Sequence, residues 1–379
     1  MNPNLDYQQL RALLQTVFGL GDRENDCLIL IDLPGGKRRD NPAWSDRRTI
    51  AREWFQHLAS HSANLPFRAI RLGMYANVGT NNGDLPERLE SLQTISQDGG
   101  STWTGQDPLR GILEASGVVL AMTEFSATAP LKILARDLGF RGATLPGFSR
   151  AMMPSLGLDY EAINKRVLEI KARMDRAISA DIALRAGGQQ YRLEVDLRFR
   201  QGHASGGILK ERGAVGNLPS GEAYIVPYEG ETPGIESSTH GLLPVQFDEE
   251  VVVFGVRGNR AEEVTSSGRH SDIQREKLSE EPAYGNIAEL GIGVLGEWGV
   301  EGVGSTLLDE KLGLHIAFGR SDHFGGSTSP VAFRKPENVI HIDWVYVPSV
   351  QPRVSADEVV LHYDGGVNET VMRSGRLIV

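Results

Sequence analysis

Cysteine is nearly absent from this chain. Cys27 is the only one among 379 residues, which excludes an internal disulfide framework and a metal site built from several cysteines. The sequence also lacks any run that approaches the ~20 apolar residues of a membrane span. No basic segment followed by an apolar one is found at its start, as a secretory signal would require. These absences predict a reduced, cytoplasmic protein without a membrane partner.

Positive charge is in deficit as well. Lys and Arg number 39 against 49 Asp and Glu, which leaves a formal net charge of −10. Such an acidic surface disfavours non-specific binding to nucleic acid or to anionic membranes, so we expect neither partner. The chain is 40% hydrophobic and 23% charged, as globular proteins are. Its length predicts two or three domains of ~150 residues each.

Residues 1–180 alternate between strand and helix patterns. Short apolar runs typical of buried parallel strands lie at 27–33, 69–74 and 118–123. Helical spacing of apolar residues falls between these runs, and a long amphipathic helix is expected at 159–180. The glycine-containing loop at 32–37 fits neither of the common nucleotide-binding motifs. The alternation predicts an α/β domain around a parallel sheet.

Residues 181–379 have a different pattern of polar and apolar residues. The segment 190–200 (QYRLEVDLRFR) alternates polar and apolar residues with a period of two, which is typical of a half-buried antiparallel strand. Further β-rich runs occur at 251–256 and 339–347, and glycine-containing turns separate them. This part therefore predicts a second, β-rich domain with only brief helices.

Side chains that can bind a metal recur within the apolar strands of this second part and at their ends. They are Glu222, Glu289, Glu310, His315, His341 and Asp343. His341 and Asp343 are two residues apart, so on a strand they share a face, as a metal site or an acid–base pair needs. Glu289 lies among small and apolar residues, where an isolated carboxylate would be costly; it is paired, ligating or at an exposed edge. Each feature alone also fits the exposed face of a sheet.

Together, these segments resemble the aminopeptidase T family of dinuclear metallo-aminopeptidases. The matching motifs are, in chain order, 217–222 (NLPSGE), 287–291 (IAELG), Glu310 with His315 five residues further, and His341 with Asp343. The likeness is strongest from 285 to 345. It implies a Rossmann-like N-terminal domain with a mostly parallel sheet, a β-rich α+β C-terminal domain that carries the metals, a homodimer, and metal ligation by all six residues, with Glu289 as the bridge.

The charge of this implied ligand set favours two ions. Its four carboxylates would gather four negative charges beside two neutral imidazoles, and without cations their repulsion would push several carboxyl groups to protonate. Two divalent ions neutralise the set. Mixed carboxylate and imidazole ligation suits Zn, Co, Mn or Mg, and the sequence does not choose among them.

One position departs from the family pattern. The family has a tyrosine seven residues after the histidine that matches His315, whereas this chain has Asp322, followed by His323. The catalytic residues expected from the resemblance are therefore Glu222, Asp322 and His323, with His323 as the candidate to take over the role of the phenol. In the alternative interpretation, Asp322 and His323 are ordinary loop residues.

The leading hypothesis is a metal-dependent aminopeptidase that hydrolyses peptides or small amides through a metal-bridged water. One alternative is a mononuclear iron enzyme related to 2,5-dihydroxypyridine 5,6-dioxygenase. That enzyme is similar to the family but has histidine where this chain has Glu289. Another alternative is a divergent member that binds a peptide or small molecule without hydrolysing it.

Overall fold

The computed structural model describes residues 4–35 and 38–379, so Gly36 and Lys37 of the first loop lie outside the described residues. The chain forms two compact units: Met1–Ala162 with Gly207–Ser220, and Ile163–Gly206 with Gly221–Val379. The predicted division into 1–180 and 181–379 differs from these units. Helix α6 (Tyr160–Met174) begins in the first unit and ends in the second, and residues 207–220 belong again to the first.

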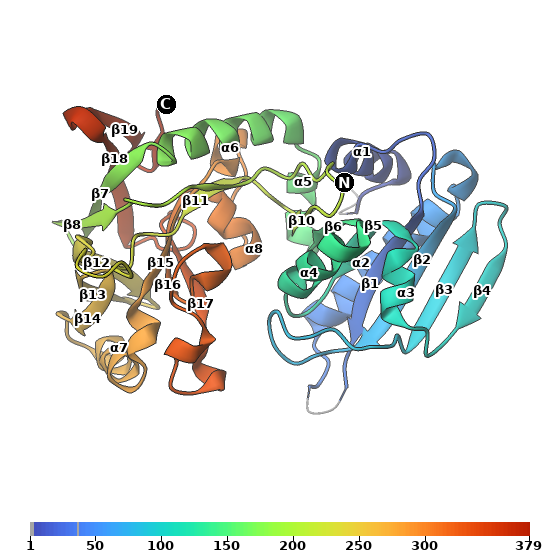
Figure 1. Cartoon of the computed structure of the whole chain (residues 1–379), viewed down its shortest axis with the longest axis horizontal. Coiled ribbons are helices and arrows are strands. Elements are labelled where there is room, and N and C mark those ends of the chain that lie inside the picture. Colours follow the sequence, from blue (N-terminus) through green and yellow to red (C-terminus); the bar gives the residue numbers. More distant parts are fainter. Residues whose placement is uncertain (1–3, 36–37) are drawn as a thin grey trace. The chain divides into compact units, whose positions relative to one another are not determined.

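The first unit is built on a seven-stranded mixed sheet in the order β10-β6-β5-β1-β2-β3-β4 (Figure 1). From β10 to β2 neighbouring strands are parallel, and β3 and β4 add an antiparallel edge. The strands are β1 (Asp26–Leu33), β2 (Ala69–Ala76), β3 (Ser91–Ser96), β4 (Ser101–Thr104), β5 (Ser116–Met122), β6 (Arg141–Thr144) and β10 (Val215–Asn217). The helices are α1 (Tyr7–Phe18), α2 (Pro42–Ala59), α3 (Leu109–Glu114), α4 (Thr128–Leu138) and α5 (Met153–Leu156).

Local sequence explains the main elements of this unit. Strand β1 is buried along nearly its whole length, and its central residues 27–31 are all apolar because both faces of the sheet are covered. Its residues Leu28 and Leu30 pack in one core cluster with side chains of α3 and α4. Helix α1 begins with a capping box between Asp6 and Gln9 and ends at Gly19, which has a left-handed conformation.

Two local predictions for the first part were wrong. The helix expected at 159–180 ends at Met174, and strand β7 (Ala177–Ala186) follows after a short turn. The stretch between 91 and 104, where short helices were expected, forms the β3–β4 hairpin instead. This hairpin is at the sheet edge, where polar strands are tolerated because one side faces solvent.

The second unit contains two antiparallel sheets. The larger has eight strands in the order β14-β13-β12-β8-β7-β18-β19-β20, and the smaller has five in the order β17-β16-β15-β11-β9. The larger sheet is made of β7, β8 (Gln189–Asp196), β12 (His240–Phe247), β13 (Glu250–Arg257), β14 (Arg260–Val264), β18 (Val354–Tyr363), β19 (Asn368–Arg373) and β20 (Arg376–Leu377). The smaller is made of β9 (His203–Ser205), β11 (Glu222–Ile225), β15 (Ile287–Gly293), β16 (Leu314–Gly319) and β17 (His341–Val345). Helices α7 (Arg269–Glu280) and α8 (Thr306–Asp309) accompany them, together with most of α6.

Aromatic residues join the two sheets of this unit. Phe318 on β16 packs edge-on against Phe254 on β13, with ring centroids 5.1 Å apart. Trp344 on β17 packs edge-on against Phe318 at 6.1 Å. Because successive residues of a strand point to opposite faces, the odd-numbered neighbours of these two residues face away from the larger sheet. That outer face carries the predicted ligands of β16 and β17.

The architecture is thus a mixed α/β fold with one sheet that contains parallel strands and two antiparallel sheets. Among residues 4–35 and 38–379, no helix is both long enough and apolar enough to span a membrane.

Candidate metal centre

The strand register of the smaller sheet gathers the predicted ligands on one face. Glu289 on β15 is paired with Ala317 on β16, and Ala317 is paired with Asp343 on β17. His315 and His341 lie two residues away from this row, on β16 and β17, so their side chains emerge on the same face. The backbone pairing therefore brings together residues that are up to 54 positions apart in the sequence.

Glu289 is shared by two possible ligand groups. The first consists of Glu222, Glu289 and His315, and the second of Glu289, His341 and Asp343; in each group the candidate ligand atoms lie within 4.8 Å of one another. Oε1 of Glu289 is 3.2 Å from Nε2 of His315, whereas Oε2 is 3.6 Å from Nε2 of His341. Each oxygen of this one carboxylate thus faces a different group.

Both histidines offer Nε2 to the cluster. Nδ1 of His315 is 3.2 Å from the carbonyl oxygen of Gly313, and Nδ1 of His341 is 2.8 Å from that of Arg320. A carbonyl only accepts hydrogen bonds, so each Nδ1 carries the proton and a neutral ring keeps its lone pair on Nε2. Such backbone contacts orient metal-binding imidazoles in general.

Burial and negative charge shape the protonation of the cluster. Burial alone would lower the pKa of His315, but its hydrogen bond with Glu289 and the charge of Glu222 outweigh this and raise the pKa to about 9. For His341, the charge of Asp343 likewise overcomes burial and raises the pKa to about 10. Burial raises the pKa of Glu289 despite both histidines. Without a metal ion, protons on these side chains offset the negative charge of the cluster. A bound cation would neutralise the same carboxylates and displace those protons.

The donor set fits a divalent ion. Oε2 of Glu222 is buried without a hydrogen-bond partner, and its nearest partner for an ion pair is Nε2 of His315 at 3.4 Å. A buried carboxylate oxygen without a donor is costly unless a cation or a water contacts it. Carboxylate oxygens with neutral imidazole nitrogens are ligands that Zn, Mn and Co accept. Glu222, Glu289, His315, His341 and Asp343 are therefore the candidate ligands of a metal ion.

Glu310 is the one predicted ligand that belongs to neither group. Its carboxylate binds the ammonium of Lys311, which also lies 2.6 Å from Oε1 of Glu222. Lys311 is almost completely buried. Burial would lower its pKa, but the charges of Glu222 and Glu310 outweigh burial and raise it, so the group is an ammonium ion. Sequence reasoning missed Lys311, although it directly follows Glu310.

Asp322 and His323 lie in a short 3₁₀ helix (Asp322–Phe324) that follows β16. The guanidinium of Arg320 binds the Asp322 carboxylate and helps to lower its pKa against the effect of burial. The His323 ring is 5.3 Å from the His341 ring. Burial and the positive charge of His341 lower the pKa of His323 to about 4, so this imidazole is neutral at pH 7.

A tyrosine that the sequence reasoning did not consider lies beside the cluster. Tyr224 is two residues after Glu222 on β11, so both side chains point to the same face. Burial raises the pKa of the Tyr224 phenol well above its ordinary value, and the charges of Glu289, Glu222 and Glu310 raise it further. Its ring stacks on His203, 5.1 Å away. The i, i+2 spacing from Glu222 was the available sequence signal.

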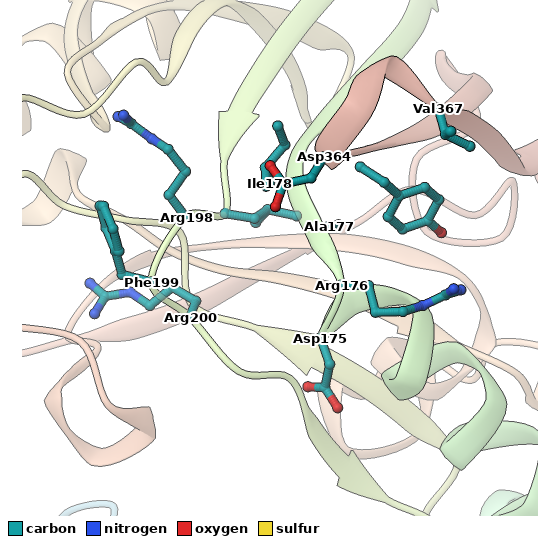
Figure 2. A pocket seen from close by; sticks show the side chains of 11 residues that line it. Asp175, Arg176, Ala177, Ile178, Arg198, Phe199, Arg200, Asp364 and Val367 are labelled. Carbon is teal, nitrogen blue, oxygen red and sulfur yellow. The ribbon is translucent and has the colours of Figure 1, made fainter.

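A separate surface hollow of about 560 Å³ occurs in the second unit (Figure 2). Arginine and aromatic side chains contribute to its lining: Arg176, Arg198, Phe199, Arg200 and Tyr363. Two of its arginines have acidic partners, since Arg198 pairs with Asp196 and Arg200 with Glu231, each at 2.6 Å. None of the predicted ligands lines this hollow, so it is distinct from the metal centre.

Comparison with known proteins supports the fold. No protein-family model and no curated protein sequence matches the chain. Among solved structures, 2,5-dihydroxypyridine dioxygenase from Pseudomonas putida aligns with a TM-score of 0.62 over 99% of this chain and 98% of that one, at 14% identity. Wild-type AmpT from Thermus thermophilus, an aminopeptidase T, aligns with a TM-score of 0.56 over 98% of both chains, also at 14% identity. These identities show a shared fold alone; both neighbours are enzymes.

Proposed function

We propose that this chain is a metal-dependent aminopeptidase that removes N-terminal residues from peptides. The observation that carries the proposal is the Glu289 carboxylate, whose two oxygens face two separate ligand groups. A carboxylate that belongs to two ligand groups can bridge two divalent ions, or bind one ion in either group. The sequence predicted two ions, but hydrolysis by a metal-activated water needs only one, so the proposal holds for either number.

The metal would polarise the scissile carbonyl and lower the pKa of a bound water. Around it, the buried Oε2 of Glu222 is free to accept a proton, which makes this atom the candidate general base. Transfer of that proton to the leaving amine would complete hydrolysis. The surplus of carboxylates also favours a substrate with a free α-ammonium group, which supports exopeptidase rather than endopeptidase action.

Tyr224, which was not predicted from the sequence to take part in catalysis, also supports the proposal. The phenol that the family pattern places at Asp322 is missing there, and Asp322 is paired with Arg320. Tyr224 brings a protonated phenol to the same face as Glu222, where it can donate a hydrogen bond to the oxyanion formed during hydrolysis. The neutral His323 beside His341 is proposed to contact the substrate, with Asp322 as its positioning residue.

The test is hydrolysis of a panel of unblocked tripeptides by protein loaded with Zn, Mn or Co, followed by chromatographic detection of the released amino acids. The same peptides with an acetylated N-terminus serve as matched substrates and should remain intact. The Tyr224→Phe variant should keep its metal and lose most of its turnover. Equal cleavage of blocked and unblocked peptides would contradict an aminopeptidase.

The dioxygenase hypothesis makes a different prediction for the same protein. His315 and His341 face different oxygens of the Glu289 carboxylate, and neither group of possible ligands among the described residues contains both histidines. The geometry therefore gives no direct support to a two-histidine, one-carboxylate iron site. Oxygen uptake by protein loaded with ferrous iron, in the presence of 2,5-dihydroxypyridine, would favour this function. Stable metal binding with neither reaction would favour the non-hydrolytic binder. The homodimer and the cytoplasmic location stay predictions.

A further inference from the structure

A buried lysine lies within the candidate centre. Lys311 follows Glu310 in the 3₁₀ helix Glu310–Leu312 and is 1% exposed. Its ammonium is 2.6 Å from Oε1 of Glu222 and also binds Oε1 of Glu310. A buried ammonium needs such partners, because an unpaired charge is strongly disfavoured away from water. These two carboxylates therefore already share a permanent cation.

This ion pair changes what Glu310 can do. Among the described residues, Glu310 is in neither group of possible metal ligands. Its carboxylate is the counter-ion of Lys311 instead. Glu222 is divided between two tasks, since Oε1 accepts from the ammonium and Oε2 faces His315.

The ammonium affects the two ligand groups unequally. A metal ion bound to Oε2 of Glu222 would share that carboxylate with Lys311, so two positive charges would face each other across a single buried group. Repulsion at such a distance is weakly screened in a buried environment. The second group, formed by Glu289, His341 and Asp343, shares no carboxylate with Lys311. It is also the more open group, since the His341 side chain is 20% exposed.

We propose that the ammonium of Lys311 replaces one metal ion of the centre, so that the chain holds a single exchangeable divalent ion at Glu289, His341 and Asp343. This inference rests on the proposed metal-dependent function and specifies its cofactor. Glu222 and Glu310 then serve to hold the built-in cation, and Oε2 of Glu222 stays available as a proton acceptor next to the ion.

The experiment counts metal ions on the folded chain. Purified protein is stripped with a chelator, incubated with excess Zn²⁺ or Mn²⁺ and desalted, and the bound metal is measured by elemental mass spectrometry. We expect one ion per chain in the unmodified protein and two in Lys311→Met, which removes the ammonium but keeps a long apolar stem. Lys311→Arg, which keeps the charge, should bind one. Lys171→Met is the matched control, since Lys171 of α6 forms a partly exposed ion pair with Asp175, just after the helix, and should not change the count.

A second pair of variants locates the ion. His341→Ala should lose it, whereas Glu222→Gln should retain it. Isothermal titration should give one binding event for the unmodified protein, and its melting temperature should stop rising after one equivalent of metal. These measurements give the number and the location of the bound ions even if Lys311→Met does not fold.

Each result has a distinct meaning. Two ions in the unmodified protein, one ion in folded Lys311→Met, or loss of the ion in Glu222→Gln but not in His341→Ala would each overturn the role of Lys311 while leaving a metal-dependent enzyme intact. No bound ion in the folded, unmodified protein would overturn the metal-dependent function together with this inference.

Discussion

A Cβ atom placed on Gly291 would lie 1.9 Å from Nε2 of His315. The two residues are directly paired across β15 and β16, and the imidazole lies over the glycine. This close approach is what lets the His315 ring reach Glu289 on the neighbouring strand, because any side chain at position 291 would occupy the same space. The glycine in the motif IAELG is thus a requirement of the cluster.

We predict that Gly291→Ala displaces the His315 ring and weakens the cluster. Overpacking of this kind costs about 1–3 kcal/mol, which urea denaturation can measure. Gly111→Ala is a suitable control, since Gly111 is exposed in α3 and a Cβ there meets no atom within 4 Å. Alanine in a helix is better than glycine by about 0.5–1 kcal/mol, so the control should be neutral or slightly stabilised. Unchanged stability in both variants would contradict the close contact.

We predict that Glu289→Gln removes metal binding. A neutral amide loses the negative charge and offers only one acceptor oxygen, so it cannot face both ligand groups as the carboxylate does. Loss of a residue that only hydrogen-bonds to a metal ligand costs about 10–100-fold in metal affinity, so loss of Glu289 itself should exceed that range. Isothermal titration with Zn²⁺ measures the effect, with the exposed Glu301→Gln as control. Affinity within threefold of the unmodified protein would exclude Glu289 as a ligand.

Sequence alone predicted which segments would carry the candidate ligands, and the part of this prediction that concerns β17 has a local cause. His341 and Asp343 share a face because of strand periodicity, which two residues suffice to define. Lys311 and Tyr224 were missed because their relevance depends on which strands are neighbours. The pairing of β11 with β15 brings Tyr224 next to Glu289, and Lys311 reaches Glu222 from the 3₁₀ helix before β16. Both arrangements depend on strand register, which is a long-range property. Glu310 was expected to bind metal because of the family resemblance, and its spacing from His315 does not indicate that its carboxylate binds the adjacent lysine.

The fold, like the site, was predicted only where a local sequence pattern indicates it. Apolar runs identified β1, β2 and β5 because strands covered on both faces are continuously hydrophobic. The β3–β4 hairpin was missed because its exposed, polar edge position leaves no such signal. The end of α6 at Met174 was also missed, since Ala177–Ala186 continues without a proline or glycine that would mark the boundary.

We predict that Cys27 is chemically inert in the folded protein. Burial, with a smaller contribution from Asp26, raises its pKa to about 12, and its side chain has no solvent exposure. The thiolate is the reactive species, so Ellman's reagent at pH 8 should label a negligible fraction of native chains. Because the chain has one cysteine, denatured protein should give one thiol per chain as the internal control. Rapid stoichiometric labelling of native protein would contradict the burial of β1.

Glu229 organises the segment that carries Asp322 and His323. Its carboxylate accepts hydrogen bonds from the Ser321 and Ser327 hydroxyls, from the Ser327 amide at 2.7 Å and from the Asn286 side chain at 2.8 Å. Burial alone would raise the pKa of Glu229, but these hydrogen bonds outweigh it and lower the pKa below its ordinary value. The ionised carboxylate is therefore part of the folded structure.

A group whose folded pKa is lowered stabilises the fold at pH values above its unfolded pKa, and this contribution is lost as the pH falls through the folded pKa. We therefore predict that Glu229→Gln destabilises the protein at pH 7 by on the order of 2 kcal/mol, since hydrogen bonds to a charged acceptor are among the stronger ones. The difference from the unmodified protein should shrink below about pH 4, near the ordinary glutamate pKa. Urea denaturation at pH 7, 5 and 3.5 measures this trend, with the exposed Glu262→Gln as control. A difference that stays constant from pH 7 to 3.5 would show that the side-chain amide fails for steric reasons, and that the charge of Glu229 does not hold the 321–328 segment.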